Sequence, residues 1–357
     1  MTRGPGPPIV EHGRQADDAW GLALSDQAAA GSGIQHVAWL YQSPDEHLAG
    51  ICDFIEAGQS AGQPVLLAVP AGLLSPGWNL PGQKAGDRSL DAGELGRNPA
   101  RLMPLVRAFA DEHKGHAVRV VCELAWAGRS TAELDEVSRY ETNANLAFDA
   151  MPITMLCPYD VARLPGSAIS AACSSHPRLR QGVSERDNND YREPNRRALG
   201  QPPLPVPPGA QRLSYQQDLR PVRSLVAAVA ARAGLASSRR TDLVIAASEV
   251  AANTLKHTEG AGLVRIWVTA DEILCQFDDS GHISDPLAGY GRPAHDQPGG
   301  QGLWLVNQVC DLAEIHTSAL GTSIRLHMFR ELPRVGLPDR ASVGEPQLGP
   351  VGPGQQR

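Results

Sequence analysis

The sequence lacks the features of a membrane-spanning or exported protein. No apolar run approaches the roughly 20 residues that a membrane helix needs. The N-terminus, MTRGPGPPIVEHGR, has no apolar core of the kind found in secretory signals. We therefore expect a cytoplasmic protein with no membrane partner.

Cysteine is scarce and dispersed. The six cysteines lie at positions 52, 122, 157, 173, 275 and 310, and no two of them form a C-x-x-C pair. This spacing suggests neither a zinc site nor a disulfide framework. We expect reduced, mostly buried thiols.

Lysine is scarce, but positive charge is not. Lys84, Lys114 and Lys256 are accompanied by 29 arginines, and the formal net charge is −7, with no concentrated basic stripe. Nucleic-acid-binding domains carry clustered positive charge, so the composition argues against direct nucleic-acid binding.

Length and local composition predict two domains. A chain of 357 residues exceeds one typical hydrophobic core. Residues 1–33 and 333–357 are rich in glycine and proline and are predicted to be disordered tails. Between them we expect a domain over 34–180, a proline-rich linker over 181–211 and a second domain over 212–332.

The first domain has the pattern of a three-layer α/β fold with a mainly parallel sheet. Its apolar runs lack the polar alternation of a half-exposed sheet and are separated by helical segments. The predicted strands are 34–41, 64–69, 118–122 and 153–157, and the predicted helices are 44–58, 99–114 and 131–148. Residues 70–86 lack the G-x-x-x-x-G-K-[ST] phosphate-binding pattern, so this domain is not expected to hydrolyse ATP.

A set of mostly polar side chains follows the third predicted strand and continues along the next helix. They are Glu123, Trp126, Arg129, Glu133, Glu141 and Asn145. Ligands of open α/β sheets bind beyond the carboxyl ends of the strands, which makes this set a candidate ligand site. The alternative, which we favour, is that these are solvated or salt-bridged helix positions.

The second domain is organised around one long helix. Ser237 or Ser238 is expected to cap it, and Glu249, Asn253 and Lys256 share one face because they lie four and three residues apart. A carboxylate accepts a proton, an amide oxygen binds a hard cation such as Mg²⁺, and an ammonium group pairs with phosphate. The face therefore suits a nucleotide, although ordinary solvated helix positions have the same spacing.

Three short motifs follow this helix. They are Asp279-Ser280-Gly281, Gly300-Gln301-Gly302-Leu303 and Gly321-Thr322. The segments around them predict strands at 263–269 and 273–277, a helix from 300, and a hairpin of 311–318 with 322–329. We expect a two-layer α/β sandwich with a mixed sheet.

Taken in order, Glu-x-x-x-Asn, Asp-x-Gly, Gly-x-Gly-Leu and Gly-Thr resemble the GHKL ATP-binding domain shared by gyrase, histidine kinases and the mismatch-repair protein MutL. The resemblance implies that Asn253 ligates Mg²⁺ and that Glu249 orients or deprotonates the attacking group. It also implies that Asp279 accepts a hydrogen bond from the adenine amino group, above a backbone turn at Gly281.

The same resemblance assigns the remaining motif residues. Gly300, Gly302 and Leu303 would lie at the lid and helix start, where free backbone N–H groups face phosphate oxygens. Thr322 would support the adenine pocket, and either Lys256 or His257 would reach the phosphates. A departure is that Ile283 stands where the family's Asp-x-Gly-x-Gly loop has its second glycine, which leaves open a weak or inactive ATPase.

Three stretches of the first domain resemble the MEDS sensory domain. They are GRNPARLMPLVRAF from Gly96, CELAWAGRSTAELDEVSRYE from Cys122 and NLAFDAMPITMLCPYD from Asn145. The resemblance covers roughly 34–180 and implies a degenerate RecA-like fold that senses a small molecule or other signal, whose identity the motifs do not fix.

A MEDS domain joined to a stand-alone GHKL domain resembles the RsbA-type anti-sigma factor regulators. The stretch GQGLWLVNQVCDLAEIHTSALGTSIRLHMF from Gly300 is close to that group's pattern. The resemblance implies a Mg-ATP-dependent serine/threonine kinase whose partners are a STAS-type anti-sigma antagonist and a sigma factor, and a homodimer formed through the ATPase domain.

Two alternatives stay open. One is a non-catalytic, nucleotide-gated module that binds the sigma factor. The other is an atypical histidine kinase with a remote acceptor such as His36 or His176, because no histidine occurs between His176 and His257, where an ordinary phosphoacceptor helix would lie.

Overall fold

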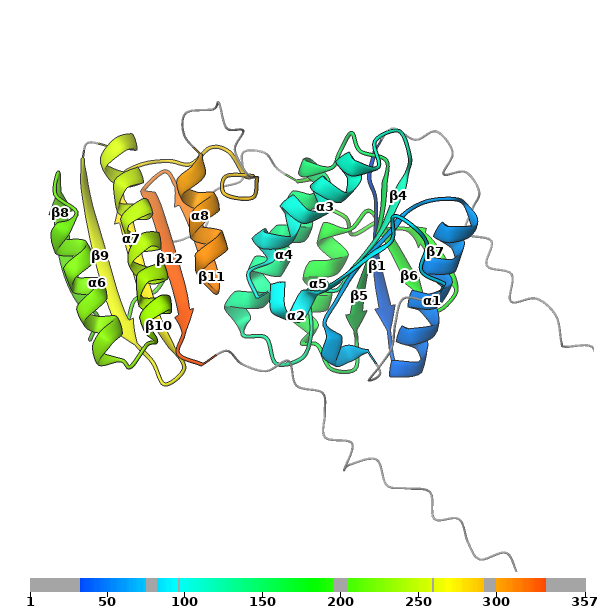
Figure 1. The fold of residues 1–357 in the computed structure, drawn as a ribbon, viewed down its shortest axis with the longest axis horizontal. Coiled ribbons are helices and arrows are strands. Elements are labelled where there is room, and N and C mark those ends of the chain that lie inside the picture. Colours follow the sequence, from blue (N-terminus) through cyan, green and yellow to red (C-terminus); the bar gives the residue numbers. More distant parts are fainter. Residues whose placement is uncertain are drawn as a thin grey trace, which may run out of the picture. The chain divides into compact units, whose positions relative to one another are not determined.

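A computed structural model describes residues 33–74, 82–95, 97–194, 204–258, 260–291 and 300–331. These residues form two sheets, each with its own set of helices (Figure 1). The predicted terminal tails fall almost entirely outside the described residues. None of the described helices has the length and apolar character that a membrane crossing requires.

The first domain is built on a seven-stranded sheet. Its strand order is β3 (Arg88–Asp91), β2 (Val65–Val69), β4 (Val118–Cys122), β5 (Ile153–Asp160), β1 (Gln35–Tyr41), β6 (Arg178–Gln181) and β7 (Ser184–Asp187). All neighbours pair in parallel except β6 and β7, which are antiparallel. The four predicted strands are therefore confirmed as a mainly parallel sheet.

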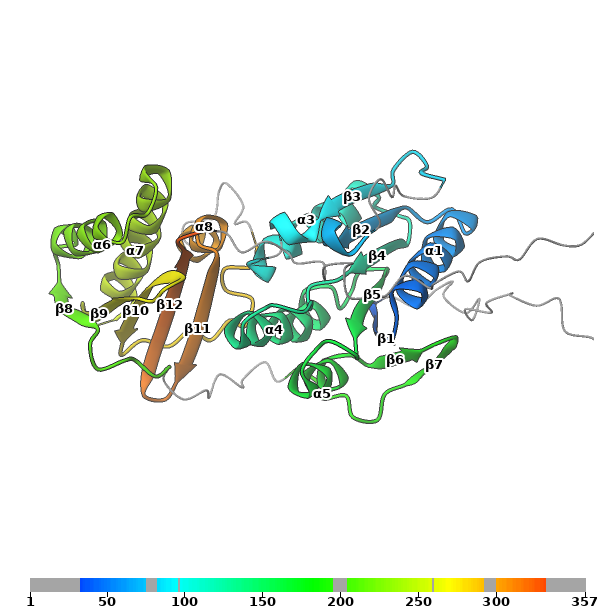
Figure 2. The same ribbon diagram turned by 90° about the horizontal axis from the view of Figure 1, so that it is seen from below.

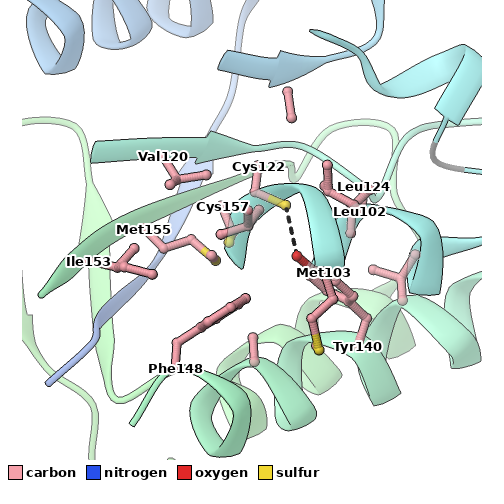
Figure 3. Close-up of a cluster of buried hydrophobic side chains, with 14 of the residues drawn as sticks. Leu102, Met103, Val120, Cys122, Leu124, Tyr140, Phe148, Ile153, Met155 and Cys157 are labelled. Atoms are coloured by element: carbon pink, nitrogen blue, oxygen red, sulfur yellow. Dashed lines mark hydrogen bonds between the residues drawn. The ribbon is translucent and has the colours of Figure 1, made fainter. Parts of the chain in front are cut away.

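Helices cover both faces of this sheet. They are α1 (Pro44–Ser60), η2 (Ala71–Leu73), α2 (Ala92–Leu95), η3 (Pro99–Arg101), α3 (Leu102–Glu112), α4 (Thr131–Ala147) and α5 (Gly166–Ser175). Trp39 and Leu67 pack with α1 in one core, whereas Val120 and Met155 belong to the core on the other face, shown in Figure 3. Because both faces are buried, the central strands are apolar along nearly their whole length. The three-layer prediction is confirmed, and Figure 2 shows the helices on either side of the sheet.

Several elements of the first domain were not predicted. They are β3, α2, α5 and the β6–β7 hairpin, and β7 falls within the predicted linker 181–211. The hairpin is supported by polar cross-strand pairs, Arg178 with Glu185 and with Asp187. It therefore has no apolar alternation for sequence reasoning to detect. Residues 195–203 of the predicted linker lie outside the described part of the chain.

The second domain is a two-layer sandwich. Its sheet has the order β11 (Leu312–Ser318), β12 (Gly321–Phe329), β10 (Glu272–Asp279), β9 (Ala261–Val268) and β8 (Gln211–Gln216). Helices α6 (Arg220–Arg232), α7 (Ser237–His257) and α8 (Gln301–Val309) lie on one face of this sheet (Figure 2). Val226, Val250 and Phe277 are part of the core between the layers.

Two details of the second domain correct the sequence analysis. All four strand pairings are antiparallel, so the expected mixed sheet is wrong. The tight turns that join β9 to β10 and β11 to β12 can form only antiparallel hairpins. The expected serine cap is also wrong, because α7 already includes Ser237 and its N-cap residue, Ala236, has no side-chain capping bond.

Candidate functional site

Glu249 and Asn253 are the two motif residues of helix α7 that lie nearest α8. Leu243, Ala246 and Val250 anchor the helix in the core. This packing leaves Glu249 and Asn253 half-buried beside it. Neither side chain forms a hydrogen bond or ion pair within the described part of the chain. Because both side chains are partly accessible and hold no partner there, they can meet a ligand without breaking an existing bond.

The N-terminus of α8 lies against these two side chains. A Cβ atom added at Gly302 would come within 3.0 Å of Glu249 Oε2 and 3.2 Å of Asn253 Nδ2. A glycine there lets the helix backbone reach the carboxylate and the amide. Gly300, the N-cap residue, has a φ of 79° and makes no side-chain capping bond, so the N–H groups of the first turn have no side-chain acceptor from the cap.

Asp279, at the end of β10, is held by two donors. Thr254 Oγ1 donates to Oδ2 at 2.6 Å, and the backbone N–H of Gly281 donates to Oδ1 at 2.8 Å. Tyr215 Oη donates to the same threonine hydroxyl at 3.0 Å, and burial raises the pKa of Tyr215 to about 12. The carboxylate is therefore fixed in orientation while retaining lone pairs for a further donor.

Glycines let the chain pass close to Asp279. A Cβ at Gly281 would lie 2.9 Å from Thr258 Cγ2 and 3.0 Å from Asp279 Oδ1. At Gly321, where φ is 128°, a Cβ would clash with the Asp279 carbonyl oxygen. Thr322 follows, and its hydroxyl donates to the Gly281 carbonyl at 2.9 Å. The start of β12 and the loop after β10 are thus joined at one point.

Seven of the nine predicted site residues line one cavity of about 390 Å³. They are Asn253, Asp279, Gly281, Gly300, Gly302, Leu303 and Thr322. Glu249 is not in the lining but touches Gly302 at its edge. Lys256 is exposed and does not line the cavity, whereas His257, the other candidate for the phosphates, does.

Sequence reasoning missed the positioning residues Thr254 and Tyr215. No motif marks them, because their role depends on a contact between α7, β8 and β10. A second cavity, of about 540 Å³, is lined by Leu204, Pro207 and strand residues such as Arg265, and it shares Asp279 and Thr322 with the smaller one. Neither Glu249 nor Asn253 lines it, so we place the chemistry in the smaller cavity.

The smaller cavity fits a purine nucleotide. Asp279 offers an acceptor for an exocyclic amino group, and Val250, Leu303 and Ile324 give apolar walls for a ring. The N-terminus of α8 offers donors for phosphate, and the unpaired amide of Asn253 lies beside it. An amide oxygen is a ligand that Mg²⁺ accepts together with phosphate oxygens and water.

Comparison with known families agrees with this geometry. Residues 214–328 match the family model described as "Histidine kinase-like ATPase domain". Residues 35–177 match the model described as "MEDS: MEthanogen/methylotroph, DcmR Sensory domain". No curated protein matches the chain. The chain therefore carries a MEDS sensory domain followed by an ATP-binding domain of the GHKL class.

The candidate polar set of the first domain is buried, which corrects the expectation of solvated helix positions. Glu123 is fully buried, accepting from Tyr41 Oη at 3.0 Å and lying 2.7 Å from His47 Nε2. Burial of the His47 ring by itself lowers its pKa, but the Glu123 carboxylate raises it by more, so the net pKa is raised. This group lies at the carboxyl ends of β1 and β4, where its carboxylate is already paired.

Two further groups of the set are also paired within the core. Glu133 lies 3.1 Å from Arg97 and 3.4 Å from Arg129, and burial lowers the pKa of Arg129 to about 9. Glu141 and Asn145 face the sheet from α4 and contact His36 on β1. The salt-bridged part of the expectation is thus met, but α4 turns its polar face toward the sheet rather than toward water.

Proposed function

We propose that the ATP-binding domain is a protein kinase that transfers the γ-phosphate of Mg-ATP to a serine or threonine of a STAS-type anti-sigma antagonist. The proposal also holds that the protein sequesters a sigma factor until the unphosphorylated antagonist competes for it, and that the MEDS domain controls this exchange. The observation that supports it is the pair of unpaired side chains, Glu249 and Asn253, at the N-terminus of α8.

Each residue has a distinct role in this proposal. Mg²⁺, when bound with ATP, neutralises charge on the phosphates. Asn253 would hold the ion by its amide oxygen, and Glu249 would orient the hydroxyl of the antagonist and accept its proton. Asp279 would select adenine, and the N–H groups at the start of α8 would bind phosphate oxygens. Positioning and electrostatic stabilisation of this kind carry most of the catalysis in phosphoryl transfer.

The burial of two histidines counts against the histidine-kinase alternative. His36 and His176, the remote acceptors considered, are both 0% exposed. A phosphoacceptor nitrogen must meet the γ-phosphate directly, so either ring would require opening of the first domain's core. Acid-labile phosphate on the protein itself would reverse this argument.

A pull-down tests the proposal. The tagged chain is captured from native lysate with and without Mg-ATP, and mass spectrometry identifies the bound proteins and new phosphorylated residues. We expect a sigma factor and a STAS protein phosphorylated on serine or threonine. The Asn253→Ala variant should lose the phosphorylation, whereas Thr241→Ala, on the exposed side of the same helix, should retain it. A sigma factor bound with no new phosphate on any protein would contradict the kinase.

One observation favours a second candidate, a nucleotide-gated binding module without phosphoryl transfer. Ile283, in place of the family's second glycine, packs against the domain core, and its N–H donates to Thr317 Oγ1 at 3.3 Å. His282 Nδ1 lies 3.1 Å from the same hydroxyl. These contacts fix a loop that glycine would leave free to hinge. Sigma release by a non-hydrolysable ATP analogue would support the module, and release that requires transfer would support the kinase.

A further inference from the structure

A cluster of four side chains, which includes Glu141 of the polar set described above, lies in the core of the first domain and is separate from the nucleotide cavity. His36, Glu141, Cys157 and His176 offer one ligand atom each, and these atoms all lie within 4.8 Å of one another. They come from β1, α4, β5 and the C-cap of α5. His36, Cys157 and His176 are 0% exposed and Glu141 is 1% exposed, so the cluster is closed to solvent.

Hydrogen bonds outside the cluster fix the tautomer of His36. Asn145 Nδ2 donates to the carbonyls of Glu141 at 3.1 Å and Ser175 at 2.8 Å, which identifies Asn145 Oδ1 as the acceptor on the other side of the amide. That oxygen lies 3.0 Å from His36 Nδ1, so Nδ1 carries a proton and donates it. In the neutral ring, Nε2 then presents its lone pair to the cluster.

His176 is fixed in the same way. Its Nδ1 lies 2.8 Å from the backbone carbonyl of Ala172 and must donate to it. Its Nε2 is buried and has no hydrogen-bond partner among the described residues. Glu141 Oε2 lies 3.7 Å from this nitrogen. A buried nitrogen lone pair directed at a carboxylate oxygen is repulsive unless a positive charge lies between them.

Four of the six distances between the ligand atoms suit one ion at the centre, and the other two are at most 4.8 Å. His36 Nε2 lies 3.1 Å from Glu141 Oε2 and 3.4 Å from Cys157 Sγ, and this sulfur lies 3.6 Å from the same carboxylate oxygen. In a tetrahedral zinc site with bonds of about 2.0–2.3 Å, neighbouring ligand atoms are roughly 3.3–3.6 Å apart. These three separations, and the 3.7 Å between His176 Nε2 and Glu141 Oε2, all lie within about 0.2 Å of that range.

We propose that His36, Glu141, Cys157 and His176 bind a divalent transition-metal ion of the zinc class within the MEDS domain. Two imidazoles, a carboxylate and a thiolate are a borderline-soft set, which favours Zn²⁺ or Fe²⁺ over Mg²⁺ or Ca²⁺. Binding replaces the S–H bond of Cys157 by a metal–sulfur bond, and the proton goes to solvent. The protein supplies all four ligands, so the site is closed and serves structure or sensing rather than hydrolysis.

Surrounding contacts have the form expected around a metal. Asn145 and the Ala172 carbonyl each hold the far nitrogen of one imidazole, as outer-sphere partners do in metal centres. Tyr159 Oη lies 3.4 Å from the second carboxylate oxygen of Glu141. Occupancy would join β1, β5, α4 and the end of α5, and this proposal is independent of the kinase.

The test uses the full chain without a polyhistidine tag. The protein is stripped with a chelator and titrated with Co²⁺, and then with Zn²⁺ as a competitor. We expect one equivalent of cobalt, a thiolate-to-cobalt charge-transfer band, d–d bands of a tetrahedral ion, and displacement of cobalt by zinc. Absence of stoichiometric binding would overturn the proposal and leave a proton shared between His36 and Glu141 in place of the metal.

Matched variants identify the ligands. Cys157→Ser should abolish the charge-transfer band and weaken binding by about 100-fold or more, and His176→Gln should weaken it similarly. Cys275→Ser is the matched thiol control, because Cys275 is a fully buried free thiol on β10 of the second domain, outside the cluster. His47→Gln is the matched control for a buried histidine–glutamate pair.

Two outcomes would contradict the assignment. Equal binding by Cys157→Ser and Cys275→Ser would mean that the ion binds elsewhere. If Cys157→Ser does not fold, the wild-type cobalt spectrum and the metal affinity of His176→Gln test the proposal instead. A wild-type spectrum without a thiolate band would overturn it. Unchanged metal affinity in His176→Gln would overturn it as well. Circular dichroism and ATP binding by the second domain report whether each variant is folded.

Discussion

The two domains differ in the polar groups of their candidate sites. In the first domain, helices cover both faces of the sheet, and Glu123, Glu133 and Glu141 are buried and paired. In the second, helices cover one face, and Glu249 and Asn253, which have no partner among the described residues, lie at or beside a cavity. The carboxylates of the first domain are already bound to partners, whereas the two side chains of the second are available to a nucleotide.

Substitution of Glu249, one of the two side chains available to a nucleotide, is expected to have the largest effect on activity. In Glu249→Gln, loss of the base should lower the rate of phosphoryl transfer by about 10²–10⁴-fold, whereas ATP affinity changes little. Transfer is measured with radiolabelled ATP and the STAS antagonist. Asp271→Asn, at an exposed carboxylate of the same domain, is the control. Transfer at the wild-type rate in Glu249→Gln would remove Glu249 from the mechanism.

Asp279 should govern the choice of base. In Asp279→Asn the acceptor that we propose for the adenine amino group becomes an amide, and the Thr254 and Gly281 donors lose a charged partner. We expect ATP affinity to fall by about 10–100-fold, with a smaller change for GTP. Isothermal titration measures both affinities. Tyr215→Phe removes only the outer hydroxyl and should cost less than about 10-fold. An equal loss for ATP and GTP would assign Asp279 to folding alone.

A substitution at Gly321 tests whether the start of β12 must lie close to the end of β10 at Asp279. In Gly321→Ala the new Cβ meets the Asp279 carbonyl, and the backbone at φ 128° is strained for an L residue. We expect the free energy of unfolding to fall by about 2–4 kcal/mol, measured by chemical denaturation. Gly234→Ala is the control, because Gly234 has φ 79° but open space around it, and it should cost about 1–2 kcal/mol. Similar losses in the two variants would refute the close approach.

Substitution of His327 is expected to have the smallest effect, a loss of stability that depends on pH. Burial by itself lowers its pKa, but hydrogen bonds to Glu272 at 2.8 Å and Glu314 at 2.7 Å raise it to about 9. Burial by itself raises the pKa of Glu314, but bonds to His316 and His327 lower it to about 2. The charged ring of His327 thus joins carboxylates from β10 and β11 across the second sheet.

The sign of each contribution follows from the shift. The raised pKa of His327 adds stability that is complete below about pH 6.5 and is lost as the pH rises through about 9. The lowered pKa of Glu314 adds stability that is present above about pH 4.5 and is lost as the pH falls toward about 2.

We therefore expect His327→Gln to lower the free energy of unfolding by about 1–3 kcal/mol at about pH 6, and by less at about pH 9.5. Denaturation curves of both proteins across this range measure the difference. A stability difference that stays constant with pH would show that the ring is not charged in the folded protein.

Local sequence patterns determined the central strands of the first domain and several residues of the nucleotide cavity. Apolar runs and periodicity located the central strands of the first domain, because these segments are buried on both faces and read as continuous hydrophobic stretches. Helical spacing brought Glu249 and Asn253 to one face, and short glycine motifs indicated Gly281, Gly300 and Gly302 as cavity residues.

Only the tertiary structure decided which polar groups meet. His36 and Cys157 are 121 residues apart in sequence, and His36 and Glu141 are 105 apart. No spacing rule joins ligands that come from separate strands and helices, so the scattered cysteines gave no sign of a metal site. The burial of α4's polar face was not predicted for the same reason, since it depends on His36 of the distant strand β1. The β6–β7 hairpin was not predicted because polar pairs, rather than an apolar pattern, hold it together.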